Sequence, residues 1–140
     1  MANRSIAFAL LVIVVGIFSG QAHAQPRTVF SGIPVVKISE GGVERFPEKI
    51  PRDKAINLSC VISEISGRYY WANRENTEMA RQVSGAFVTY VAINGSGYVR
   101  VIDKSGKAAA PLMSPTEAEF DYVEHMILGL RSVTYYGHLR

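Results

Sequence analysis

Residues 85–102 read GAFVTYVAINGSGYVRVI, two runs of β-branched and aromatic residues joined by the glycine-rich quartet Asn94–Gly97. Such runs favour strands, and glycine supplies the positive φ angles of a tight turn, so the stretch predicts a β-hairpin. The central pair of the turn is either Asn94-Gly95 or Gly95-Ser96. These alternatives differ by one residue in register, and a slip of one residue exchanges the two faces of a strand. The sequence therefore leaves open which side chains face the core.

A second hairpin is expected over residues 56–73. Apolar and mostly polar residues alternate from Ile56 to Ser63, which predicts a strand with Cys60 on its apolar face. Ser66-Gly67 is typical of a turn, and the following residues 68–72, RYYWA, read as the returning strand.

A helix is expected over residues 115–130. Ser114 is a good N-cap, Pro115 fits the first helical position, and Glu117 completes a capping box. Apolar residues then recur at spacings of three and four, which predicts an apolar stripe. The members of this stripe are Tyr122, Val123, Met126, Ile127 and Leu130. After the helix, residues 132–136, SVTYY, predict a last strand.

These elements predict an α+β domain at residues 56–140. Its sheet is expected to be small and antiparallel, with about five strands from two hairpins and a C-terminal strand, and the C-terminal helix packs on one face. Residues 25–55 hold four of the six prolines. Because proline interrupts both helices and ladders, this segment is expected to be an extended, partly ordered arm that precedes the domain.

Residues 1–24 predict a secretory signal peptide. Arg4 supplies the positive charge, residues 6–18 form the apolar run, and Ala22-His23-Ala24 has the pattern of a cleavage site. The stretch from Ser5 to Gly20 is shorter than the roughly 20 residues that a transmembrane helix needs. We therefore expect export, cleavage after Ala24, and a periplasmic or extracellular product that is not attached to a membrane.

Composition limits the class of partner and cofactor. The net charge of +3 is too small to indicate a protein that binds nucleic acid. Cys60 is the only cysteine, so an intramolecular disulfide is impossible and a buried structural thiol is expected. Small secreted eukaryotic domains are often rich in disulfides, so their absence favours a bacterial exported protein. We expect no cofactor, and a monomer or weak homo-oligomer.

Aromatic residues on two predicted strands indicate a binding surface. Because side chains alternate between the faces of a strand, some rings of Tyr69-Tyr70-Trp71 and Tyr135-Tyr136 are expected on the exposed sheet face, opposite the helix. Rings of this kind suit sugars or peptides. The candidate binding residues are Arg68, Tyr69, Trp71 and Tyr135. The partner is expected to be an envelope protein or polysaccharide.

The favoured function is a non-enzymatic binding or interaction module of the bacterial envelope. One alternative is a small envelope hydrolase that uses His125 with a carboxylate such as Asp121. Another is a structural subunit whose residues 25–55 add a strand to a neighbouring sheet. Glu117, Asp121 and Glu124 share a predicted helix side with His125, but zinc signatures need further ligands at set spacings, so no metal is expected.

The expected export predicts the residue at which the mature chain begins. The purified exported product should begin at Gln25, because cleavage is expected after Ala24. Intact mass spectrometry and N-terminal sequencing measure this directly. A product that still carries Met1 would show that residues 1–24 are retained.

Overall fold

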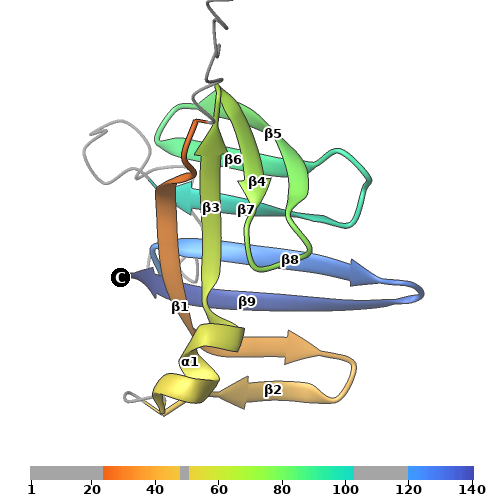
Figure 1. The fold of residues 1–140 in the computed structure, drawn as a ribbon. Helices are drawn as coiled ribbons and strands as arrows, with labels where there is room; N and C mark the ends of the chain where they lie inside the picture. Colours follow the sequence, from red (N-terminus) through yellow and green to blue (C-terminus); the bar gives the residue numbers. More distant parts are fainter. Residues whose placement is uncertain (1–23, 48–50, 103–119) are drawn as a thin grey trace, which may run out of the picture.

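The computed structural model describes residues 24–47, 51–102 and 120–140. In these ranges nine antiparallel strands form one sheet in the order β2-β1-β3-β4-β5-β6-β7-β8-β9, and β9 also pairs with β1. The eight strands other than β2 therefore close into a barrel (Figure 1). The elements are β1 (Arg27–Ser39), β2 (Gly42–Arg45), α1 (Arg52–Leu58), β3 (Cys60–Ile65), β4 (Arg68–Trp71), β5 (Thr77–Ser84), β6 (Phe87–Ala92), β7 (Gly97–Ile102), β8 (Tyr122–Leu128) and β9 (Arg131–Leu139).

Strand β1 closes the barrel because it bends. Its first half pairs with β3, and its second half lies between β2 and β9. The register with β9 shifts between Pro34 and Val36, and a shift of this kind bends a strand. In Figure 1 the hairpins β1–β2 and β8–β9 extend side by side from the same end of the barrel.

The predicted α+β fold is wrong. The sheet is a closed barrel, and residues 27–39, which were expected in an arm ahead of the domain, form one of its walls. The prolines misled the prediction because Pro34 lies within β1 next to the register shift, where an irregular ladder tolerates a missing N–H. The predicted signal peptide at residues 1–24 lies almost wholly outside the described residues.

The helix predicted over residues 115–130 is also wrong. Residues 122–128 form β8, and residues 114–119, which carry the predicted cap, lie outside the described residues. Tyr122 and Glu124 are fully buried in the barrel, whereas Val123 and His125 face outward. A buried glutamate among apolar neighbours obscured the two-residue period of this strand.

The other strand predictions are confirmed, with changed limits. Strands β6 and β7 form the expected hairpin, in which Val91 lies opposite Tyr98 and Gly95 has a φ of 77°. Strands β3 and β4 form the second hairpin, although the strand begins at Cys60 because residues 52–58 form α1. Cys60 is fully buried, as its position on an apolar face predicted. The last strand is confirmed as β9 and is longer than expected.

The barrel interior is filled with side chains. Alternate residues of each strand point inward, as the pleat of a strand requires. The buried cluster consists of Phe30, Cys60, Ile62, Trp71, Met79, Tyr90, Ala92, Val99 and Tyr122. The interior is therefore the hydrophobic core of the protein. The described part of the chain contains no helix with the length and apolar character that a membrane crossing requires.

One carboxylate lies within this core. Glu124 is 0% exposed, and its Oε1 accepts a hydrogen bond from Trp71 Nε1 at 3.0 Å. Arg74, in the turn between β4 and β5, places Nη2 3.2 Å from Oε1 and 3.3 Å from Oε2 of the same carboxylate. Arg74 also donates through Nη1 to the backbone oxygen of Asn57, at the end of α1. The buried pair thus joins β8 to the β4–β5 turn and to the helix.

Burial raises the pKa of Glu124, while the Arg74 guanidinium and the Trp71 hydrogen bond oppose that rise. Because the folded pKa lies above the ordinary value, the folded protein binds the proton more tightly than the unfolded chain. The ionised carboxylate therefore costs stability as the pH rises from the ordinary pKa through the folded one. Arg74 reduces this cost.

Replacing Arg74 tests this role. Arg74→Met should lower the free energy of unfolding by about 3–5 kcal/mol at pH 7, because it leaves a buried carboxylate without its cation. The loss should be smaller at pH 4, where the carboxyl group becomes neutral. Urea denaturation between pH 4 and pH 8 measures both. Adding Glu124→Gln to Arg74→Met should restore much of the stability at pH 7, and an equal loss at all pH values would contradict the interpretation.

Candidate binding site

The barrel register places a group of side chains together on the outer wall. Val99 is fully buried, so Tyr98 and Arg100 on either side of it point outward. On the next strand, His125 lies opposite Tyr98 and Val123 lies opposite Arg100. Opposed residues on one face of an antiparallel pair lie roughly 5 Å apart, so these side chains form a continuous surface.

This surface extends to β9 and β6. Tyr136 on β9 lies opposite Val123, and Phe87 on β6 shares the outward face of Ile102, its partner on β7. We call the set the outer aromatic surface. Its members are Phe87, Tyr98, Arg100, Val123, His125 and Tyr136.

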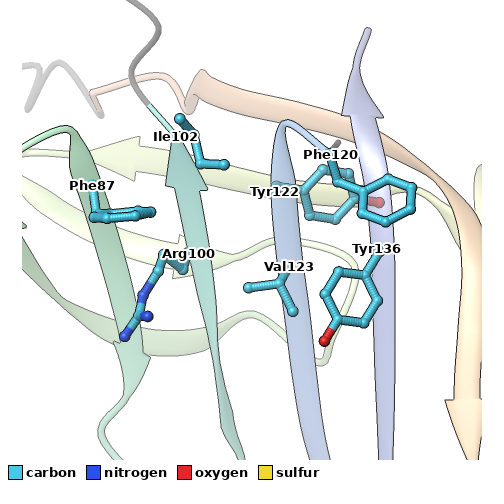
Figure 2. A pocket seen from close by; sticks show the side chains of 7 residues that line it. All are labelled: Phe87, Arg100, Ile102, Phe120, Tyr122, Val123 and Tyr136. Carbon is cyan, nitrogen blue, oxygen red and sulfur yellow. The ribbon is translucent and has the colours of Figure 1, made fainter. Parts of the chain in front are cut away.

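A shallow depression lies within the outer aromatic surface. Figure 2 shows its lining, with Phe87 and Arg100 at one side and Tyr136 at the other. The Phe120 ring centre lies 5.3 Å from that of Tyr136, and Phe120 is only 7% exposed, so little of its ring is open to a ligand. The depression has a volume of about 10 Å³, which is room for roughly one water molecule. A ligand would therefore lie on the outer aromatic surface and not inside a pocket.

Arg100 supplies the charge of this surface. Its guanidinium carbon lies 5.5 Å from the centre of the Phe87 ring and 5.9 Å from that of Tyr98. Its Nε donates a hydrogen bond to Thr89 Oγ1 at 3.4 Å. Each ring contact holds the cation by roughly 0.5–1 kcal/mol. Within the described residues, no carboxylate forms an ion pair with Arg100.

The histidines are held by structural contacts. The His125 ring stacks on Tyr98, with 5.4 Å between ring centres, and its Nδ1 lies 2.8 Å from Thr134 Oγ1. Asp121 is instead close to His138, whose Nδ1 lies 3.2 Å from Asp121 Oδ2. The same oxygen accepts a hydrogen bond from the backbone N–H of Leu139. On a strand, residues four apart are separated by roughly 13 Å. The structure therefore does not join His125 and Asp121 into a catalytic pair.

The structure does not bring the four residues predicted from sequence onto one surface. Trp71 is 1% exposed and points into the core. Tyr69 is half-buried and packs against Tyr90, whereas Arg68 is exposed and pairs with Glu78 at 3.7 Å. Tyr135 stacks on Phe46 with 6.4 Å between ring centres. Closure of the barrel removed the flat exposed sheet face on which these residues were expected to meet, and their part in binding stays a prediction.

Sequence reasoning missed the outer aromatic surface although it identified the hairpin that carries half of it. Phe87, Tyr98 and Arg100 all belong to residues 85–102. Their common outward face follows from the register, which two possible turns left open. The contribution of Tyr136 depends on its pairing with β8, which the predicted helix had excluded.

Two wider grooves lie toward the other end of the molecule. One, of about 470 Å³, lies along the tips of the β1–β2 and β8–β9 hairpins, and the other, of about 570 Å³, lies between β1, β2 and α1. Arg131 pairs with Glu40 at 3.7 Å and Lys37 with Glu44 at 3.5 Å, whereas Lys54, in the groove beside α1, forms no ion pair with a described residue. The outer aromatic surface differs from both grooves because its cation, Arg100, lies over two aromatic rings.

Neither metal chemistry nor comparison with known proteins identifies a different site. In the ranges that the structure describes, no three histidine, cysteine or acidic side chains gather as a metal site would require. Burial raises the pKa of the Cys60 thiol well above its ordinary value, so this group is not a ready nucleophile. Comparisons with family models, with curated proteins and with solved structures gave no match.

The wall behind the depression depends on a close fit around Tyr122. Its ring packs against a glycine on β1 and one on β9, and a Cβ atom would lie 2.4 Å from the ring at Gly32 and 2.6 Å from it at Gly137. The Tyr122 hydroxyl is buried and has no hydrogen-bond partner among the described residues. The fit thus depends on the ring, while the hydroxyl adds only a desolvation cost.

Two substitutions separate the ring from the hydroxyl. Gly137→Ala should destabilise the protein by roughly 1–3 kcal/mol or more, because the added methyl group meets both Tyr122 and the backbone oxygen of Ile33. Tyr122→Phe should leave the free energy of unfolding unchanged or raise it, because it removes an unsatisfied buried group. Thermal and urea denaturation measure both. A marked loss of stability in Tyr122→Phe would reveal a partner for the hydroxyl.

Proposed function

We propose that this protein is a non-enzymatic binding module of the bacterial envelope, and that its ligand binds at the outer aromatic surface. The observation that carries the proposal is Arg100, a cation that lies over two aromatic rings and has no carboxylate partner in the described part of the chain. Such an arrangement keeps charge and ring surface available together. Binding sites use both properties.

The arrangement favours binding over the hydrolase alternative. A hydrolase needs a base within hydrogen-bond reach of a nucleophile or water, and usually an orienting group beside that base. His125 instead contacts Thr134 and Tyr98, and Asp121 contacts His138 and the backbone of Leu139. A ligand on this wall would meet rings and a guanidinium.

The strand pairing of residues 27–39 limits the structural-subunit alternative. That alternative requires residues 25–55 to add a strand to a neighbouring sheet. Residues 27–39 instead pair within the same chain, on one edge with β3 and β2 and on the other with β9. Their backbone groups therefore take part in closing the barrel. Of the described strands within residues 25–55, β2 is the one that keeps an open edge, because it pairs only with β1 at the end of the strand order.

Hydrogen exchange with mass spectrometry tests the proposed function. Solubilised polysaccharide from a bacterial envelope should slow exchange in peptides from residues 87–102 and 120–137. Tyr136→Ser should abolish this protection, because it removes the ring at one side of the depression. Tyr70→Ser is the matched control, since Tyr70 is a half-buried tyrosine on β4, away from the surface.

The two variants must first show native far-ultraviolet circular dichroism spectra and similar melting temperatures. Protection that survives in Tyr136→Ser, or that disappears equally in Tyr70→Ser, would contradict the proposed site. Absence of protection with every envelope fraction would contradict the proposed function.

A further inference from the structure

We infer that the groove between the β1–β2 hairpin and α1 binds a small amphipathic anion, a molecule with one apolar chain and one carboxylate. This groove is separate from the outer aromatic surface, and neither proposal depends on the other. Three properties of the groove lead to the inference, which are its volume, its apolar lining and the sign of its charge.

The groove has the volume of a site for a small molecule. It holds about 570 Å³, and pockets for small molecules span roughly 300–1,000 Å³. In Figure 1, α1 lies beside the β1–β2 hairpin at one end of the molecule. The residues that line the groove are Lys37, Glu44, Phe46, Pro47, Pro51, Lys54, Asn57 and Leu58.

On the hairpin side, the lining residues share one face of the strands. Lys37 lies opposite Glu44 in the register of β1 and β2, so both side chains point to the same face. Phe46 lies two residues beyond Glu44 and continues the ladder, because its N–H donates to the backbone oxygen of Val35 at 2.9 Å. Its ring therefore points to the face that carries Lys37 and Glu44.

On the helix side, the lining residues recur at helical spacing. Pro51 directly precedes α1, and Lys54 and Leu58 follow at spacings of three and four residues. Residues at these spacings lie on the same side of a helix, one turn apart. Ala55 is buried instead, so one side of α1 packs on the protein while another borders the groove.

The apolar part of the lining suits the chain of an amphiphile. Phe46, Pro47, Pro51 and Leu58 provide ring and aliphatic surface. The Phe46 ring stacks on Tyr135, with 6.4 Å between ring centres, so its position is supported by β9. An apolar chain that packs on this surface removes both surfaces from water, which favours binding.

The charges of the lining favour an anionic head group. Two lysines and one glutamate line the groove, so one positive charge remains after they are balanced. Lys37 is paired with Glu44 at 3.5 Å. Lys54 is exposed and forms no ion pair within the described residues. A ligand carboxylate would therefore meet Lys54 without displacing an acidic side chain of these residues.

Nuclear magnetic resonance titration of the purified protein tests the inference. The probes are octanoate and octylamine, which have aliphatic chains of the same length and opposite charges at neutral pH. Both are used below the concentrations at which they form micelles. Octanoate should shift backbone amides of residues 37–47 and 51–58 and should bind about tenfold more tightly than octylamine, because Lys54 attracts one head group and repels the other.

Charge variants of Lys54 provide the second readout. Lys54→Gln should bring the two affinities together, and Lys54→Glu should reverse the preference, so that octylamine binds more tightly. A variant that fails to fold loses both probes and does not reverse their order. Arg68→Gln is the matched control, since Arg68 is an exposed cation on β4, and it should keep the preference of the unaltered protein.

A separate variant tests the apolar lining. Phe46→Ser should weaken the binding of both probes about tenfold, because it removes the ring on which the chain packs. Ile56→Ser is the control, since Ile56 is 61% exposed on the same helix and is not among the lining residues. It should leave both affinities unchanged.

The outcomes are decisive for the groove alone. Equal affinity for the two probes, or a preference for octanoate that survives in Lys54→Glu, would overturn the inference. Absence of octanoate binding, or shifts centred on residues 87–102 in place of the groove, would also overturn it. None of these results bears on the proposed function, whose own test follows protection of residues 87–102 and 120–137.

Discussion

The fold depends on a carboxylate enclosed in its core. Glu124 lies on β8 and is bound by Trp71 from β4 and by Arg74 from the turn that follows. A buried charge is tolerable only when it is paired and hydrogen-bonded, so the three groups must assemble together. They lie on strands that are not neighbours in the sheet, because β5, β6 and β7 separate β4 from β8 in one direction around the barrel. The pair therefore acts across the interior and fixes how the two sides of the barrel face each other.

The burial of core side chains also determines which residues lie on the outer wall. Each inward residue on a strand dictates that its neighbours point outward, so burial of Glu124 and Val99 places His125, Val123 and Arg100 on one surface. The core and the candidate binding site are thus two faces of the same strands. A change that shifted β8 by one residue would bring Glu124 to the surface and His125 into the core.

The sequence was informative where local chemistry decides the structure. The hairpins at residues 56–73 and 85–102 were predictable because glycine-containing turns separate runs of strand-forming residues, and both occur. The helix at residues 115–130 was predicted because Glu124 was assigned to a polar face, and the partner that makes it a core residue, Arg74, is distant in the sequence. Closure of the barrel was equally inaccessible, since the pairing of β1 with β9 has no local signature. The candidate site could not be predicted for the same reason. Its side chains share a surface only because β6, β7, β8 and β9 pair with one another.

The pairing of β1 with β9 has a consequence for the order of events in folding. The first strand of the described chain finds its partner in the last, so the barrel cannot close until the final residues have left the ribosome. Most other pairings join strands that follow one another in the described chain, so these hairpins can form first and the β1–β9 pairing last, because distant contacts require the closure of a long loop. Until β1 and β9 meet, their open edges can pair with strands of other molecules, so late closure makes shielding from aggregation a requirement of the protein's synthesis.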